Sequence, residues 1–177
     1  MYALSLKQLP CDASAFYDVE GFDRKLIKKI ALVAMNVKRS KGKRPYQGAL
    51  QAIRENICKD GTITYEHAKA GFYAFIEKHK GIENYICSDF GIKGMFYDSL
   101  IMEGCMYELM VKPKQRIVIY SAHDELVCPA DPDIVKIVLA QMEKSYCKVI
   151  KDALVKSHKL NKNDPLPEWI KPSIKQS

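Results

Sequence analysis

One short segment, residues 117–128, interrupts the helical spacing of apolar residues in this chain and so limits its possible folds. On either side of it, apolar residues recur every three or four positions, as they do along one face of a helix. Within it, two β-rich runs, "IVIYSA" and "ELVC", are separated only by His123 and Asp124. This pattern predicts two strands joined as a tight hairpin, with the apolar runs buried. The chain is therefore expected to be an α+β protein that is mostly helical.

Helical periodicity is clear in the segments 22–38, 46–58, 65–80, 95–111 and 132–156. Asp23, Thr64 and Asp131 are suited to cap three of these helices, and Pro132 fits the first helical position. The expected organisation is a lead-in over 1–21, a helical region over 22–94, a helix–hairpin–helix region over 95–157 and an extended tail over 158–177.

The charge of the chain points to polyanionic partners. The net charge is +7, and residues 24–44 contain nine Lys or Arg and no acidic residue. Such a patch is typical of nucleic-acid or nucleotide binding, although a solvated basic face is the plain alternative. The residues expected to contact nucleic-acid phosphates are Lys38, Arg39, Lys41, Lys43 and Arg44.

The cysteines and the hydropathy indicate a cytoplasmic protein. None of the six cysteines is spaced as CxxC, and several lie among apolar residues, as reduced core cysteines do. No apolar run approaches the roughly 20 residues that span a bilayer, so no membrane partner is expected.

The tripeptide His123-Asp124-Glu125 is the main candidate for chemistry. Adjacent carboxylates at the tip of a hairpin present oxygen atoms, which are the ligands that Mg²⁺ prefers. Asp124 is therefore the expected metal ligand, with Glu125 and His123 beside it. The alternative is that charged residues simply favour hairpin turns.

A row of basic side chains is expected on the first long helix. Arg24 and Lys28 are four residues apart, so they project from one face, and Lys29 belongs to the neighbouring row. A rigid basic row of this kind is suited to the phosphates of a nucleoside triphosphate.

In this order, the basic helix and the acidic hairpin resemble the C-terminal half of single-subunit nucleic-acid polymerases, the superfamily of family A DNA polymerases and phage-type RNA polymerases. The run from Arg24 to Lys28 is similar to the Arg-x3-Lys helix of the fingers, which binds the phosphates of the incoming nucleotide. The stretch "YSAHDELV" is similar to the palm hairpin, whose Asp binds a catalytic metal. About two turns after the Lys, where the family has an aromatic residue followed by Gly that senses the substrate sugar, this chain departs from the pattern and has Asn36-Val37. Asn36 is the expected nucleotide contact there, and the sequence does not indicate the sugar. The resemblance implies a magnesium-dependent, template-directed nucleotidyltransferase whose partners are template, primer and nucleoside triphosphates.

The resemblance lacks one component. The superfamily needs a second metal-binding Asp in a strand before the fingers helix, and none of Asp12, Asp18 and Glu20 follows an apolar strand. "MYALSLKQL" resembles the helix that comes after that missing motif. The hypothesis is therefore a polymerase fragment that is inactive alone and completed by an N-terminal segment of the same or another chain. The alternative is a non-catalytic, basic, helical accessory protein that binds nucleic acid in phage or plasmid replication.

Two further groups are expected to be structural. Met95, Met102, Met106 and Met110 lie at helical spacing and are expected in a core. Tyr65, Tyr73 and Phe96 are expected to pack within the protein rather than to stack on bases.

Overall fold

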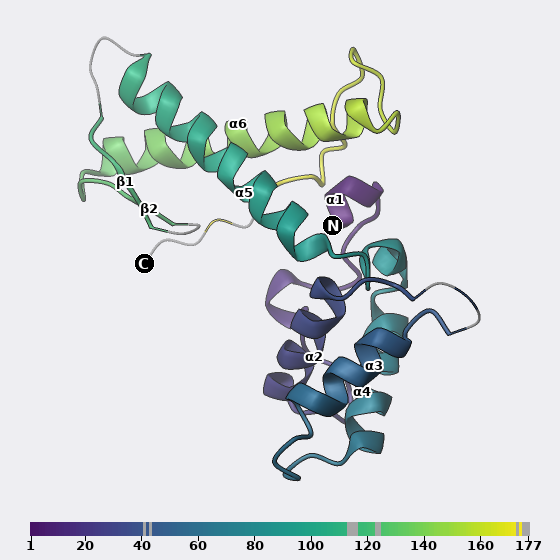
Figure 1. The fold of residues 1–177 in the computed structure, drawn as a ribbon. Helices are drawn as coiled ribbons and strands as arrows, with labels where there is room; N and C mark the ends of the chain where they lie inside the picture. Colours follow the sequence, from purple (N-terminus) through teal and green to yellow (C-terminus); the bar gives the residue numbers. More distant parts are fainter. Residues whose placement is uncertain (41, 43, 113–116, 123–124, 173, 175–177) are drawn as a thin grey trace. The chain divides into compact units, whose positions relative to one another are not determined.

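The computed structural model describes residues 1–40, 42, 44–112, 117–122, 125–172 and 174. The protein is mostly helical, with 59% of residues in helices, a two-stranded antiparallel hairpin and a long C-terminal helix (Figure 1). The predicted α+β fold class is thus confirmed. The chain divides into two compact units, unit 1 over Met1–Lys93 and unit 2 over Gly94–Ser177.

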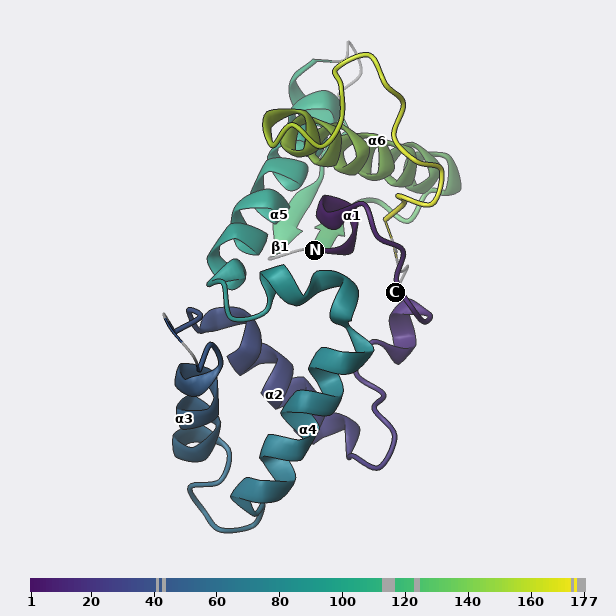
Figure 2. The same ribbon diagram turned by 90° about the vertical axis from the view of Figure 1, so that its right-hand side faces the viewer.

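Unit 1 is built around three helices that pack against one another. Its elements are α1 (Tyr2–Ser5), the 3-10 helix η1 (Ala13–Ala15), α2 (Arg24–Asn36), α3 (Gln47–Asn56), α4 (Tyr65–Lys78) and the 3-10 helix η2 (Lys80–Tyr85). Helices α2, α3 and α4 contact each other pairwise, and both views show them side by side (Figure 2).

The core of unit 1 uses the predicted apolar faces. Ile30, Ile53, Phe72 and Phe75 are fully buried between α2, α3 and α4. Each such side chain stabilises the fold by about 1.5–3 kcal/mol relative to an exposed position. Gly71 lets α4 approach α2 closely, because a Cβ there would lie 3.2 Å from the Ile30 side chain.

Side-chain caps fix the starts of the helices as predicted. Asp23 accepts a hydrogen bond from the backbone N–H of Leu26 at 3.0 Å, and Thr64 accepts one from His67 at 3.3 Å. These bonds satisfy N–H groups that the first turn of a helix leaves without partners.

The short N-terminal helix differs from expectation. "MYALSLKQL" forms only the four-residue helix α1, which ends at Leu6 in a left-handed backbone conformation (φ 52°). A longer helix would continue past Leu6, so the likeness to the helix after the missing polymerase motif is limited to one turn.

Unit 2 contains the hairpin and the longest helix. Helix α5 (Phe90–Met106) begins before the unit boundary and continues into a π-helical turn, η3 (Tyr107–Val111). The strands β1 (Tyr120–Ala122) and β2 (Glu125–Val127) follow, and then α6 (Pro132–Lys156). Asp131 caps α6 by accepting from the N–H groups of Asp133 and Ile134, which confirms the predicted helix.

The predicted burial of the hairpin strands is wrong. Tyr120 is 69% exposed and Val127 is 55% exposed. The buried residue of this region is Ile119, which precedes β1 and packs with Cys105, Leu109 and Val138. A two-stranded ribbon of three-residue strands has two faces, and the core of unit 2 covers little of either.

The segment after α6 contacts that helix again near Ile170. Ile170 is buried at 3% exposure, and the Cys147 thiol on α6 contacts the Ile170 carbonyl oxygen at 3.9 Å. The Pro-rich tail thus covers part of α6. Within the described residues, no helix combines the length and the apolar character that a membrane crossing requires.

Candidate functional site

Arg24 occupies the first position of α2 and contacts the preceding loop. Its guanidinium forms an ion pair with Asp18 and lies 5.7 Å from the centre of the Tyr17 ring. Both partners of the pair are about half exposed, so the pair contributes only about 0–1 kcal/mol. A phosphate group can therefore replace the Asp18 carboxylate at little cost.

Lys28 and Lys29 lie one turn further along α2 and are exposed. Ile27 and Ile30, which flank the two lysines in the sequence, are fully buried. The core contact thus fixes the orientation of α2 and leaves the basic row of Arg24 and Lys28 facing solvent.

Asn36 ends α2 and lies far from the start of the basic row. It is twelve residues after Arg24 and eight after Lys28, hence about 18 Å and about 12 Å along the helix axis. Its side-chain amide donates to the Leu32 carbonyl oxygen at 2.9 Å. The structure therefore places Asn36 at the opposite end of α2 from Arg24.

Two residues of the predicted nucleic-acid segment are paired with carboxylates. Lys38 forms an ion pair with Asp89 at 3.4 Å. The Arg39 guanidinium lies 3.6 Å from the Glu83 carboxylate and 5.2 Å from the centre of the Tyr46 ring. Lys41 and Lys43 lie outside the described residues.

Arg44, the last residue of this segment, is exposed and lines a groove of about 660 Å³ in unit 1. The groove also involves Arg54 on α3 and Tyr65 and Tyr73 on α4. The Arg54 guanidinium lies over the Tyr65 ring, 4.9 Å from its centre. The groove thus combines basic and aromatic side chains from three parts of the chain.

The hairpin of unit 2 has the register that the sequence predicts. Ala122 pairs with Glu125, and Tyr120 pairs with Val127. His123 and Asp124, the two residues between Ala122 and Glu125, lie outside the described residues. Glu125 begins β2 and is exposed.

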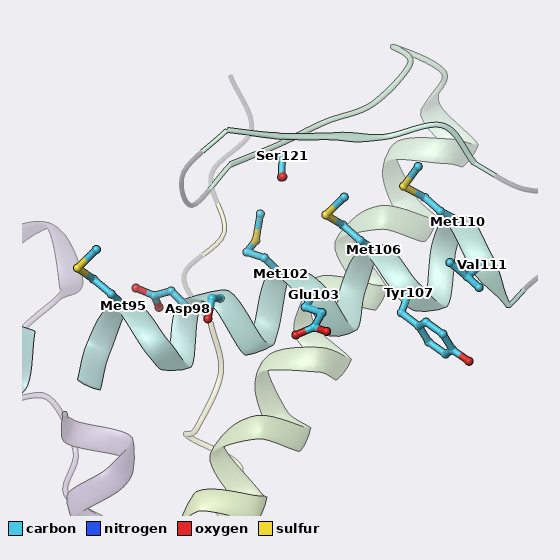
Figure 3. A pocket seen from close by; sticks show the side chains of 10 residues that line it. Met95, Asp98, Met102, Glu103, Met106, Tyr107, Met110, Val111 and Ser121 are labelled. Atoms are coloured by element: carbon cyan, nitrogen blue, oxygen red, sulfur yellow. The ribbon is translucent and has the colours of Figure 1, made fainter. Parts of the chain in front are cut away.

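A hollow of about 750 Å³ lies between α5 and the hairpin (Figure 3). The side chains of Met102, Met106 and Met110 point from the helix toward the strand that contains Ser121. Met102 is buried, whereas Met95, at the end of the methionine row, is 73% exposed (Figure 3). The methionine row is therefore only partly core, because Met95 is open to solvent.

Within the described part of the hairpin, the carboxylate comes from Glu125 on β2, and the expected ligand Asp124 lies outside the described residues. One exposed carboxylate does not by itself form a magnesium site, because Mg²⁺ also needs waters, phosphate oxygens or a further carboxylate. Among the described residues, His, Cys, Asp and Glu side chains form no group of three that could bind a metal.

Comparisons with models of protein families, with curated proteins and with solved structures found no match. The site must therefore be judged on its own chemistry.

Sequence reasoning missed Arg54, Tyr65 and Tyr73 as members of one site. Tyr65 and Tyr73 are eight residues apart, a spacing that places two side chains on the same side of a helix. That spacing could have indicated a shared surface, but it gives no sign that Arg54 of the preceding helix lies against it. The two buried cysteines are poor candidates for a nucleophile, since burial raises the pKa of the Cys87 and Cys105 thiols to about 11.

Proposed function

We propose that the chain is the fingers-like and palm-like part of a magnesium-dependent, template-directed nucleotidyltransferase. The observation that supports it most is the β1–β2 hairpin, in which Ala122 pairs with Glu125 so that His123 and Asp124 are the connecting residues. The palm hairpin of the polymerases that the sequence resembles has its metal-binding Asp at this place. We place the protein in the cytoplasm, where its six free cysteines stay reduced.

In the proposed reaction, a primer 3′-hydroxyl attacks the α-phosphate of a nucleoside triphosphate, and pyrophosphate leaves. Arg24, Lys28 and Lys29 bind the triphosphate and neutralise its charge. Asp124 binds magnesium, which supplies charge neutralisation on the phosphates when it is present. Glu125 and His123 support the hairpin tip or contact the primer end. Asn36, at the opposite end of α2 from Arg24, would contact the nucleotide on the side away from its phosphates.

The chain alone is expected to lack polymerase activity. A two-metal phosphoryl-transfer site needs further carboxylates, which an N-terminal polymerase segment of the same or another chain would add. The exposed apolar side chains of unit 2 support such a partner. Met95, Phe96, Tyr107 and Tyr120 are each more than half exposed, and isolated domains rarely leave that much apolar surface on neighbouring elements uncovered.

Nucleotide binding by the purified chain tests this function. A labelled nucleoside triphosphate should bind in the presence of Mg²⁺ and bind at least tenfold more weakly in EDTA, as measured by equilibrium dialysis. Asp124→Asn and Lys28→Ala should each weaken Mg²⁺-dependent binding. Lys148→Ala, which removes the same charge from the exposed side of α6, should not. Binding that is independent of Mg²⁺ and unchanged by Asp124→Asn would contradict the proposal.

A second function, a non-catalytic accessory protein that binds nucleic acid in phage or plasmid replication, is favoured by the basic and aromatic groove of unit 1. Asp124→Asn separates the two. It should abolish nucleotide addition by the chain once it is combined with a polymerase segment that supplies the further carboxylates, whereas an accessory protein would bind nucleic acid as before.

A further inference from the structure

The groove of unit 1 has an unusual combination of side chains. Its walls come from the residues before α3, from α3 and from α4. Helices α3 and α4 pack side by side (Figure 2). The residues used below are Arg44, Tyr46, Arg54, Tyr65 and Tyr73.

Tyr73 is an exposed aromatic ring in a fixed position. It is 44% exposed, yet its ring packs edge-to-face against Phe72 at 5.5 Å and against Tyr46 at 6.3 Å between ring centres. Phe72 is fully buried in the core. A ring that is supported from behind and open in front can stack on a flat partner without a large loss of conformational entropy.

Tyr46 is fixed as firmly. Its hydroxyl donates to the Glu83 carboxylate at 2.5 Å and accepts from Arg39 at 3.2 Å. Burial, followed by the bond to Glu83, raises the pKa of Tyr46 to about 12, so the ring stays neutral at physiological pH. Tyr46 thus supports Tyr73 and lines the groove beside it.

The two arginines provide the charge. The Arg54 guanidinium carbon lies over the Tyr65 ring, 4.9 Å from its centre, an arrangement that positions the guanidinium while leaving N–H groups for an acceptor. Arg44 is exposed and lines the same groove, so it adds a second guanidinium. The acidic residue of the lining, Glu55, accepts a hydrogen bond from Gln51 at 2.9 Å.

We propose that this groove binds single-stranded nucleic acid, with bases stacked on Tyr73 and phosphates bound by Arg44 and Arg54. Aromatic rings that alternate with basic side chains are how proteins bind single strands without reading sequence. Tyr65 and Tyr73 are separated by about 12 Å along α4, which exceeds the size of a single base, so one base cannot contact both rings. A duplex fits poorly, because its bases are stacked on one another and cannot lie on Tyr73.

If the proposed polymerase function holds, this groove is where the chain contacts its nucleic-acid partner. Binding in the groove itself needs neither magnesium nor Asp124. The two proposals can therefore fail separately. Loss of Mg²⁺-dependent nucleotide binding would remove the catalytic proposal and leave the groove untouched.

The test is fluorescence anisotropy with a fluorescein-labelled oligothymidylate, in EDTA and at two salt concentrations. Wild-type protein should bind, and Tyr73→Ala should weaken binding about tenfold, because stacking contributes about 1–3 kcal/mol per base. Tyr73→Phe keeps the ring and should stay within about twofold of wild type. Arg54→Ala should weaken binding and reduce its salt dependence.

The control is Lys148→Ala on α6, which removes one positive charge far from these residues in sequence and should leave binding within about twofold. Circular dichroism spectra should show that each variant keeps its helices. The proposal is overturned if folded Tyr73→Ala and Arg54→Ala bind like wild type. It is also overturned if the oligothymidylate does not bind, or if a duplex of the same length binds as tightly as the single strand.

Discussion

The Tyr2 hydroxyl donates a hydrogen bond to Nδ1 of His79 at 2.8 Å, joining residues 77 positions apart in the sequence. The other ring nitrogen, Nε2, lies 2.8 Å from the Phe16 carbonyl oxygen, to which it must donate. His79 is fully buried, and its ring stacks on Phe16 with 4.3 Å between ring centres. The two hydrogen bonds therefore fix a neutral tautomer with the proton on Nε2, and they attach the N-terminal segment to the end of α4.

Removing the Tyr2 hydroxyl should destabilise unit 1. Tyr2→Phe leaves the buried Nδ1 without a donor, and an unsatisfied buried polar group costs about 1–3 kcal/mol. Urea unfolding followed by circular dichroism should show a loss of that size. Tyr107→Phe, at a 54% exposed position in unit 2, serves as the matched control and should change the stability by less than about 0.5 kcal/mol. An equal effect of both variants would show that the Tyr2–His79 bond contributes nothing.

The same histidine should make stability depend on pH. Burial, the largest cause, lowers the pKa of His79 below its ordinary value of 6.5. The hydrogen bond to the Phe16 carbonyl opposes this shift, and the neighbouring Lys78 adds to it. Above pH 6.5 the side chain is neutral in both the folded and the unfolded chain, so its contribution to stability is fully present. As pH falls below 6.5, the unfolded chain takes up a proton that the folded chain does not, and stability decreases.

Melting temperatures between pH 8 and pH 5 check this dependence. The melting temperature should fall below pH 6.5 in the wild type. In His79→Gln, which has no titrating group at this position, the decrease over the same interval should be smaller. Parallel curves for the two proteins would assign the pH dependence to other groups.

The cap of α6 should contribute measurably to unit 2. The Asp131 carboxylate accepts from the N–H groups of Asp133 at 2.9 Å and Ile134 at 3.2 Å. Asp131→Ala should lower the free energy of unfolding by about 1 kcal/mol, the usual effect of losing an N-cap. Asp152→Ala, an exposed position within the same helix, removes the same charge without a cap and should be neutral or slightly stabilising. A loss in Asp152→Ala as large as in Asp131→Ala would show that charge, not capping, is responsible.

The elements that sequence predicted best are those with local signals at their ends. Helix α6 begins at Pro132 after its Asp131 cap, because capping chemistry is encoded in adjacent residues. The start of α5 was placed five residues too late, at Met95, since Gly91 and Gly94 are typical helix breakers. In the folded chain Gly91 lies within the helix because of a tertiary contact. The Asn36 side chain packs against it so closely that a Cβ on residue 91 would lie 1.8 Å from Asn36 Oδ1, and only glycine leaves room for it.

The candidate sites also differ in whether a local sequence signal or tertiary packing determines them. The basic row on α2 and the hairpin register follow from short-range spacing, so both were predictable. The groove was not, because Arg54 and Tyr65 meet only through the packing of α3 on α4, and one sequence has no local signal for that contact. The exposure of Tyr120 and Val127 was missed for a related reason. A β-rich pattern predicts a strand but does not show how much of the core is available to cover it.

Glu83 should restrain the binding of nucleic acid by unit 1. Its carboxylate lies 3.6 Å from the Arg39 guanidinium and accepts from the Tyr46 hydroxyl, so it competes with a phosphate for Arg39. Glu83→Gln removes the competing charge, while the amide oxygen can still accept from Tyr46. Affinity for the labelled oligothymidylate should rise about two- to fivefold, which corresponds to the roughly 0.5–1 kcal/mol of an exposed ion pair.

Glu77→Gln is the matched control for this change. Glu77 lies on α4 of the same unit and forms an ion pair with Lys80 at 3.5 Å, so the variant alters the net charge equally without releasing Arg39. Its affinity should stay within about twofold of wild type. A rise of the same size in both variants would attribute the effect to the overall charge of the protein. In that case Arg39 would be a structural partner of Tyr46 and Glu83, and no phosphate ligand.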